Sequence, residues 1–362
     1  MGSSEGQEAT AAAARDAAPV TERSLVLVAG SGRSGTSLFT GILQRLGYHV
    51  PKPEVTADVT NPRGFAESQW VIDFHTRLLR RANVQVSDAR PGAWALAANV
   101  ALEDDVRQEL RSWLDEQFRQ ADHLVIKDPR LSWFLPLWRR CGEDAGVAPR
   151  FATVLRHPAA VIDSKQRSYG KWQGDVDRTA GWLNQVLFTE RATRGGPRAF
   201  VRYQDLLDDW TQPVARVGDL LGLAVVRDAP APAIVQVHEF VDRSLSRSRT
   251  TWDDFEIPAG LRDQADEVWT LVSGLAEDGA DDGSLTESLD AARAAYIALY
   301  QDAEAIAQSS VVAGHRAPTP GRRHSRAVRL MQRVPRRYRS KVPVRWRVTV
   351  ARALDRKGVS SP

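Results

Sequence analysis

The chain has 362 residues, 43% of them hydrophobic and 26% charged, which is enough to bury one large core or two smaller ones. Its single cysteine, Cys141, excludes an internal disulfide framework and a cysteine-based zinc site. No apolar run reaches the roughly 18 residues of a membrane-spanning helix, and residues 1–22 lack the basic start and apolar core of a signal peptide, so the sequence predicts a cytoplasmic protein.

The formal net charge of +4 hides an uneven distribution along the chain. Residues 315–357 hold 15 of the 49 Lys and Arg residues against one acid, Asp355, which leaves 34 basic and 44 acidic residues elsewhere. We therefore predict a disordered leader over 1–22, a globular domain over 23–312 and a separate basic tail over 313–362.

Short apolar runs alternate with helical patterns through the globular part. The runs that predict buried strands lie at 24–29, 123–126, 151–155 and 199–203. The helical patterns lie at 38–46, 68–81, 102–119, 131–140, 158–168, 175–194, 212–221, 261–275 and 286–307. Residues 205–209 are interpreted as a polar connection. This alternation predicts an α/β fold with a mostly parallel central sheet between two helix layers.

A glycine-rich segment, Gly30-Ser-Gly-Arg-Ser-Gly-Thr-Ser37, joins the first predicted strand to the first predicted helix. Such a turn aims backbone N–H groups at one point, where the helix dipole also favours negative charge. The hydroxyls of Thr36 and Ser37 add donors. Gly and Ser are also ordinary turn residues, but the strand before and the helix after place phosphate binding ahead of an empty turn.

The segment differs from the loop of nucleoside triphosphatases. Gly30 and Gly35 have the spacing of that loop, but Thr36 stands where a lysine would reach the β- and γ-phosphates. Arg33 is the cation within the turn instead. The sequence therefore argues against ATP hydrolysis.

Residues 30–38 resemble the 5′-phosphosulfate-binding loop of sulfotransferases that use 3′-phosphoadenosine 5′-phosphosulfate (PAPS). Many members have Lys at the position of Arg33, whereas the protein-tyrosine branch and many bacterial members have Arg. The resemblance implies a P-loop-like fold and a leaving phosphate stabilised by Arg33. It also implies a 5′-phosphosulfate held by Gly32, Arg33, Ser34, Gly35, Thr36 and Ser37.

Two later segments resemble further motifs of the same family. In Val154-Leu-Arg156-His-Pro158, an arginine ends a strand and Ser164 follows eight residues later, as in the 3′-phosphate-binding motif. The alternative is that Arg156 forms a surface ion pair; Arg167 and Ser168 are weaker candidates. Tyr203, in a stretch that resembles Y-E-D-L-L, is predicted to approach the nucleotide phosphate, although strand-end tyrosines also pack structurally.

A candidate catalytic base lies in Asn61-Pro-Arg-Gly-Phe-Ala-Glu67, which resembles a stretch of bacterial sulfotransferases. Transfer to a hydroxyl requires a group that accepts the proton, and a carboxylate can do so. Glu67 is therefore predicted to be the base. The alternatives are an acid in the first turn of a helix and a rival base, His75.

Three other features have no single interpretation. The charges of Lys127-Asp-Pro-Arg130 either orient the site or form an internal salt-bridge network, so neither Lys127, Asp128 nor Arg130 receives a role. Arg243 falls where related proteins close a loop over the nucleotide. Four tryptophans either stack on an acceptor or belong to the core, namely Trp70, Trp94, Trp172 and Trp182.

The basic tail interleaves arginines with apolar and aromatic residues between 322 and 347. We rank a solvated disordered tail first, contact of residues 315–357 with an anionic membrane surface second, and nucleic acid last. If the second holds, the protein lies peripherally at the inner membrane face.

Together these patterns predict a PAPS-dependent sulfotransferase that acts on a hydroxyl of a carbohydrate, a glycolipid or a small molecule. No metal is expected, because cysteine clusters are absent and the seven histidines show no ligand spacing. Two rivals stay open at this point: a P-loop kinase or hydrolase, and an inert nucleotide-binding protein that acts through its tail.

Overall fold

The computed structural model describes residues 22–58, 61, 63–170, 173–242, 251–277 and 283–316. The predicted leader and basic tail lie outside these ranges almost entirely. The chain divides into two compact units, 1–300 and 301–362. The described part of the second unit is the C-terminal part of helix α14 (Ser284–Arg316). The predicted boundary near residue 312 stays a prediction.

Four parallel strands form the central sheet in the order β2-β1-β3-β4. They are β1 (Ser24–Ala29), β2 (His123–Lys127), β3 (Arg150–Leu155) and β4 (Arg198–Arg202). Every residue of β1 is buried, as a continuous apolar run requires when helices cover both faces of a parallel sheet. The predicted α/β fold with a parallel sheet is confirmed.

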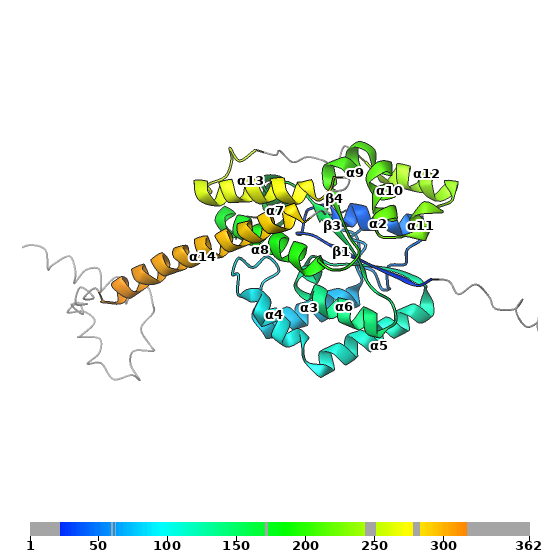
Figure 1. The fold of residues 1–362 in the computed structure, drawn as a ribbon, viewed down its shortest axis with the longest axis horizontal. Helices are drawn as coiled ribbons and strands as arrows, with labels where there is room; N and C mark the ends of the chain where they lie inside the picture. Colours follow the sequence, from blue (N-terminus) through cyan, green and yellow to red (C-terminus); the bar gives the residue numbers. More distant parts are fainter. Residues whose placement is uncertain are drawn as a thin grey trace, which may run out of the picture. The chain divides into compact units, whose positions relative to one another are not determined.

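Helices pack on both faces of this sheet (Figure 1). One face, with Leu25 and Leu27, packs against α3 (Gln69–Ala82), α4 (Ala93–Ala101), α5 (Asp104–Gln120) and α6 (Leu135–Asp144). The other, with Val26 and Val28, packs against α2 (Thr36–Leu46), α10 (Thr211–Leu220) and α12 (Ala231–Phe240). The period of two along β1 thus produces the three layers.

A third cluster of apolar side chains extends the fold beside β3 and β4. It joins Leu155 and Phe200 to helices α7 (Pro158–Tyr169), α8 (Asp175–Thr193), α13 (Ala259–Gly274) and the first turns of α14. Three short helices complete the described elements: η1 (Pro129–Phe134), α9 (Tyr203–Asp209) and α11 (Ala224–Arg227).

Some predicted element boundaries are wrong. The helix expected over 131–140 is two elements, η1 and α6, because Asp128 caps the first and Pro136 occupies the first turn of the second. Residues 205–209 are helical rather than a connection, and α9 begins at Tyr203, which is therefore not a strand residue. Burial of Leu206 and Leu207 explains this, since packing overrides the polar local sequence.

The strand order creates a switch point between β1 and β3. From β1 the chain crosses to β2 on one side, and it later returns to β3 on the other side. Connections that leave two adjacent parallel strands in opposite directions open a crevice at their carboxyl ends. The glycine-rich loop follows β1 and Arg156 follows β3, so both lie at this crevice.

Candidate active site

The glycine-rich loop between β1 and α2 has the backbone of an anion cradle. Arg33 (φ 76°) and Gly35 (φ 98°) both have a positive φ, and the amide of Ser34 bonds back to the carbonyl of Ser31 at 3.0 Å. Gly35 precedes α2, whose N-terminus has no side-chain cap. The first amides of that helix are therefore open to a bound anion.

Two buried hydroxyls in this loop are suited to an anionic ligand. Ser31 and Ser34 are each 1% exposed, and neither side-chain oxygen has a hydrogen-bond partner among the described residues. A buried polar atom without a partner is costly, and a phosphate or sulfate oxygen would satisfy both hydroxyls. The loop therefore fits the group that the sequence predicts.

The predicted 5′ and 3′ residues contact one another directly. The Nε of Arg33 donates to the Oγ of Ser164 on α7 at 3.1 Å, and the Nη1 of Arg156 donates to the carbonyl of Arg33 at 2.9 Å. The guanidinium of Arg156 also lies 4.5 Å from the ring centroid of Tyr203. The loop, the end of β3, α7 and α9 thus converge on one site.

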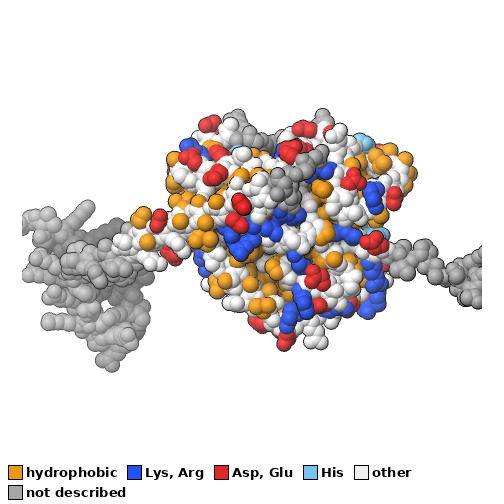
Figure 2. All heavy atoms as spheres, viewed as in Figure 1, with side chains coloured by type: hydrophobic (Ala, Val, Ile, Leu, Met, Phe, Trp, Pro, Cys, Tyr) orange, Lys and Arg blue, Asp and Glu red, His pale blue; other side chains and the backbone are white. Residues whose placement is uncertain are grey.

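Electrostatics at this point favour an anion. Burial lowers the pKa of Arg156; Tyr203 opposes this shift, and the neighbouring charge of Arg33 adds to it. Burial raises the pKa of Tyr203, because it disfavours the charged form of that side chain as well. Two guanidiniums close enough to repel each other would both be stabilised by a phosphate between them. On the face shown in Figure 2, basic side chains gather near its centre.

Glu67 joins the same site through a residue to which the sequence assigned no role. Its carboxylate forms a buried ion pair with Lys127, the last residue of β2. The ammonium of Lys127 also donates to the Oγ of Ser37 at 2.9 Å and to the carbonyl of Phe65 at 3.3 Å. Lys127 therefore connects the predicted base to the glycine-rich loop.

The environment of Glu67 suits a proton acceptor. Burial raises the pKa of its carboxyl group, while the charge of Lys127 opposes the shift. The residue precedes α3, which begins at Gln69, so the alternative of an acid in the first helical turn is wrong. The only sequence signal for Lys127 is that it directly follows the predicted strand 123–126, and in the structure it ends β2 at the register position of Val28.

His75 cannot act as the rival base. It is fully buried, its Nε2 accepts from the indole N–H of Trp138 at 2.8 Å, and its Nδ1 lies 2.7 Å from Asp128. Indole is only a donor, so Nδ1 carries the proton and bonds to the carboxylate. Burial alone would raise the pKa of Asp128, but its bonds to His75 and Arg130 hold it below the usual value.

Three of the four tryptophans that the sequence singles out lie within the described residues. Trp94 and Trp182 are buried in the core, and Trp70 stacks on Trp113 with ring centroids 4.3 Å apart. Trp172 and Arg243 lie outside the described residues.

Within the described ranges, no cluster of His, Cys, Asp or Glu side chains is placed to hold a metal ion. In the same ranges no helix has the length and hydropathy to cross a bilayer.

Lys165, beside Ser164, gives a pH-dependent prediction. It is 7% exposed and donates to Ser87 Oγ at 3.2 Å; burial, then the charge of Arg178, lowers its pKa to about 8. A lowered lysine pKa destabilises the folded state below pH 8, and this cost disappears as pH rises to the unfolded value of 10.5. Lys165→Met removes this buried charge but also its bond to Ser87, so it should raise the free energy of unfolding at pH 7 by about 1 to 3 kcal/mol.

Urea denaturation at pH 7 and pH 10 measures this effect. The gain from Lys165→Met should shrink at the higher pH. The exposed Lys52 provides the control, because Lys52→Met should change stability little at either pH. A destabilised Lys165→Met variant at pH 7 would contradict the prediction.

Comparison with known proteins gives one family. The family model described as "Sulfotransferase family" matches residues 26–228, a range that contains all the candidate residues from Gly32 to Tyr203. No curated protein matches the chain.

Two solved structures are similar to this chain. The sulfotransferase domain from the Synechococcus PCC 7002 olefin synthase is 18% identical, with a TM-score of 0.40 over 70% of this chain and 97% of that domain. The sulfotransferase domain from the curacin biosynthetic pathway is 17% identical, with a TM-score of 0.40 over 69% and 98%.

Proposed function

The chain belongs to the sulfotransferase family, and on this premise we propose that it transfers the sulfuryl group of PAPS to a hydroxyl group of a carbohydrate, a glycolipid or a small-molecule acceptor. The observation that carries the choice of donor is the convergence of Arg33, Arg156 and Ser164 at the switch point. A donor with phosphates at both its 5′ and its 3′ position would engage all three residues.

The loop and the end of β3 would divide the binding of the donor. The amides at the start of α2 and the hydroxyls of Ser31 and Ser34 would receive the 5′-phosphosulfate. Arg156 and Ser164 would hold the 3′-phosphate, with the ring of Tyr203 packed against the guanidinium. ATP has no 3′-phosphate, so these residues would also give selectivity against it.

Arg33 and Glu67 would perform the chemistry. Bound PAPS supplies a sulfuryl group on a phosphate leaving group. As the acceptor oxygen forms its bond to sulfur, the bond from sulfur to the bridging phosphate oxygen breaks. The acceptor proton passes to Glu67, and Arg33 stabilises the negative charge on the departing phosphate.

Lys127 would hold the carboxylate of Glu67 in a fixed position relative to the glycine-rich loop. Its ammonium contacts Glu67 and Ser37 together, which keeps the carboxylate ionised and fixed beside the loop. This role would explain why a lysine is buried at the end of β2. Peripheral contact of residues 315–357 with an anionic membrane stays a prediction outside the described residues.

The proposal is tested by incubating the full chain with radiolabelled PAPS and, separately, glycans, glycolipids and small hydroxylated metabolites. We expect label in one of the three acceptor classes and none with Arg33→Ala. Label in none of them would contradict the proposed acceptors, and equal labelling by Arg33→Ala would contradict the assigned site.

A further inference from the structure

A pocket lies away from the candidate active site, at the end of the sheet where β4 begins. It has a volume of about 440 Å³ and is lined by Arg194, Gly195, Gly196, Arg198, Gly283 and Thr286. Arg198 is the first residue of β4, whereas the candidate active site lies at the carboxyl ends of the strands. The sulfotransfer reaction therefore uses none of the residues that line this pocket.

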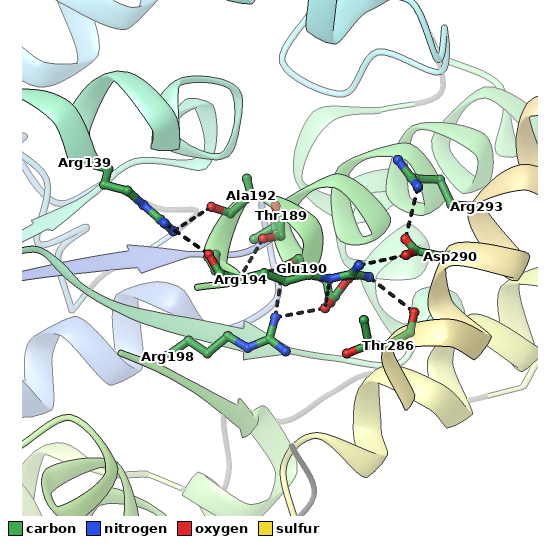
Figure 3. A network of polar contacts seen from close by, with 10 residues as sticks. Arg139, Thr189, Glu190, Ala192, Arg194, Arg198, Thr286, Asp290 and Arg293 are labelled. Atoms are coloured by element: carbon green, nitrogen blue, oxygen red, sulfur yellow. Dashed lines mark hydrogen bonds and ion pairs between the residues drawn. The ribbon is translucent and has the colours of Figure 1, made fainter. Parts of the chain in front are cut away.

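The contacts beneath the pocket bring together more positive than negative charge (Figure 3). Glu190 accepts from Arg194 and from Arg198, at 2.6 Å and 2.9 Å. Asp290 accepts from Arg194 at 2.9 Å and from Arg293 at 3.0 Å.

Arg139 supplies a fourth guanidinium to this cluster. It donates to the carbonyls of Ala192 and Arg194, at 2.9 Å and 3.0 Å, and so binds no carboxylate in Figure 3. Three guanidiniums thus share two carboxylates, and the fourth binds only carbonyl oxygens. The buried Nε of Arg293 has no hydrogen-bond partner among the described residues. The cluster favours the entry of an anion.

The backbone around the pocket also favours an anion. Gly283 directly precedes α14 and Thr286 lies in its first turn, and the N-terminus of this helix carries a partial positive charge. The negative C-terminal end of α8 is covered, because Arg139 and Arg198 bond to its last carbonyls. Gly195 and Gly196 leave room for a ligand to approach the main chain.

We propose that this pocket binds a small phosphate or sulfate ester through its tetrahedral oxyanion. The oxyanion would lie against Arg194 and Arg198, and the volume leaves space for an attached group larger than a free ion. The site is separate from the donor site, so the proposal does not depend on the proposed function.

Gly196 provides a sharp test. A Cβ there would lie 3.6 Å from Phe151 Cε2 and 3.7 Å from Arg139 Nη2, which are ordinary contacts. The backbone of Gly196 is also not in the positive-φ region. Gly196→Asp would therefore place a carboxylate in the lining of the pocket, beside the guanidinium of Arg139, where its charge competes with an anionic ligand. Gly196→Asn is the neutral variant of the same size.

The probes are glucose 6-phosphate, glucose 6-sulfate and inorganic phosphate, added to the full chain at constant ionic strength. 3′-phosphoadenosine 5′-phosphate is added to compete with the probes at the candidate active site, and Gly196→Asp identifies the part of the response that comes from the pocket. Thermal unfolding should show a rise in Tm with at least one ester for the wild type and for Gly196→Asn. Gly196→Asp should start from a higher Tm and bind the same ester at least tenfold more weakly.

Three results would overturn the proposal. They are no rise in Tm for the wild type, an equal rise for Gly196→Asp, and a rise with inorganic phosphate but with neither ester. Glucose at the same concentrations controls for an effect of the sugar alone.

Discussion

Glu67→Gln is expected to lower kcat by about a thousandfold, the middle of the range for loss of a general acid or base. The amide keeps the size of the side chain and can still accept a hydrogen bond from Lys127, but it cannot take the acceptor proton. Binding of 3′-phosphoadenosine 5′-phosphate should be unchanged, because Arg156 and Ser164 are untouched. Steady-state kinetics and calorimetric titration of the same preparation measure both effects.

The pH dependence of the rate gives an independent view of the same residue. Burial raises the pKa of Glu67, and only the ionised carboxylate accepts a proton. The acid limb of the rate profile should therefore lie above the ordinary pKa of 4.5, and activity should fall as pH falls through it. In Glu67→Gln this limb should disappear from the residual rate.

Glu54 offers a matched control for Glu67. It lies in the same stretch of chain before α3, and its carboxylate pairs with Lys52 and Gln44 rather than with the loop. Glu54→Gln should retain full activity. Full activity in Glu67→Gln would move the role of the base to another residue, and equal losses in both variants would indicate a general disturbance of this stretch.

Gly35→Ala is expected to weaken binding of 3′-phosphoadenosine 5′-phosphate by at least a hundredfold. A Cβ at this position would overlap the ring of Tyr203, with Cε2 only 2.8 Å away, and the φ of 98° is one that side chains rarely adopt. The loop must therefore move away from Tyr203 and Arg156, and the amides of α2 no longer aim at one point. Calorimetric titration measures the loss.

Gly146→Ala separates the two causes of weaker binding in Gly35→Ala, namely backbone strain at a positive φ and overlap with Tyr203. Gly146 has a φ of 78°, but nothing lies within 4 Å of an added Cβ. The variant should lose about 1 kcal/mol of stability from backbone strain and retain nucleotide binding. Unchanged binding in Gly35→Ala, with both variants equally destabilised, would contradict the proposed role of the loop.

The parts of the fold that could be predicted from sequence are those in which local pattern and packing agree. The run 24–29 is apolar throughout because it is buried on both faces, and a glycine turn with a helix after it needs no distant partner. The assignment of Tyr203 to the end of a strand is wrong, because local pattern and packing disagree there. Its strand pattern ends one residue earlier because burial of Leu206 and Leu207, a tertiary effect, draws it into a helix.

The candidate site also contains residues that could be predicted from sequence and residues that could not. Arg33, Arg156 and Ser164 could be grouped from motifs, and their contacts agree with that grouping. The role of Lys127 could not be separated from that of Asp128, because both have the same charged sequence around them. Their partners are distant in sequence: Lys127 contacts Glu67 and Ser37, whereas Asp128 is bonded to the buried His75.

The central claim is that the site between β1 and β3 binds a nucleotide with a 3′-phosphate. Calorimetric titration of the full chain with 3′-phosphoadenosine 5′-phosphate and, separately, with ATP and Mg²⁺ tests it most directly. The first ligand should bind much more tightly than the second, and Arg156→Gln should remove most of that difference. Tight binding of ATP with Mg²⁺, together with no binding of 3′-phosphoadenosine 5′-phosphate, would contradict the claim.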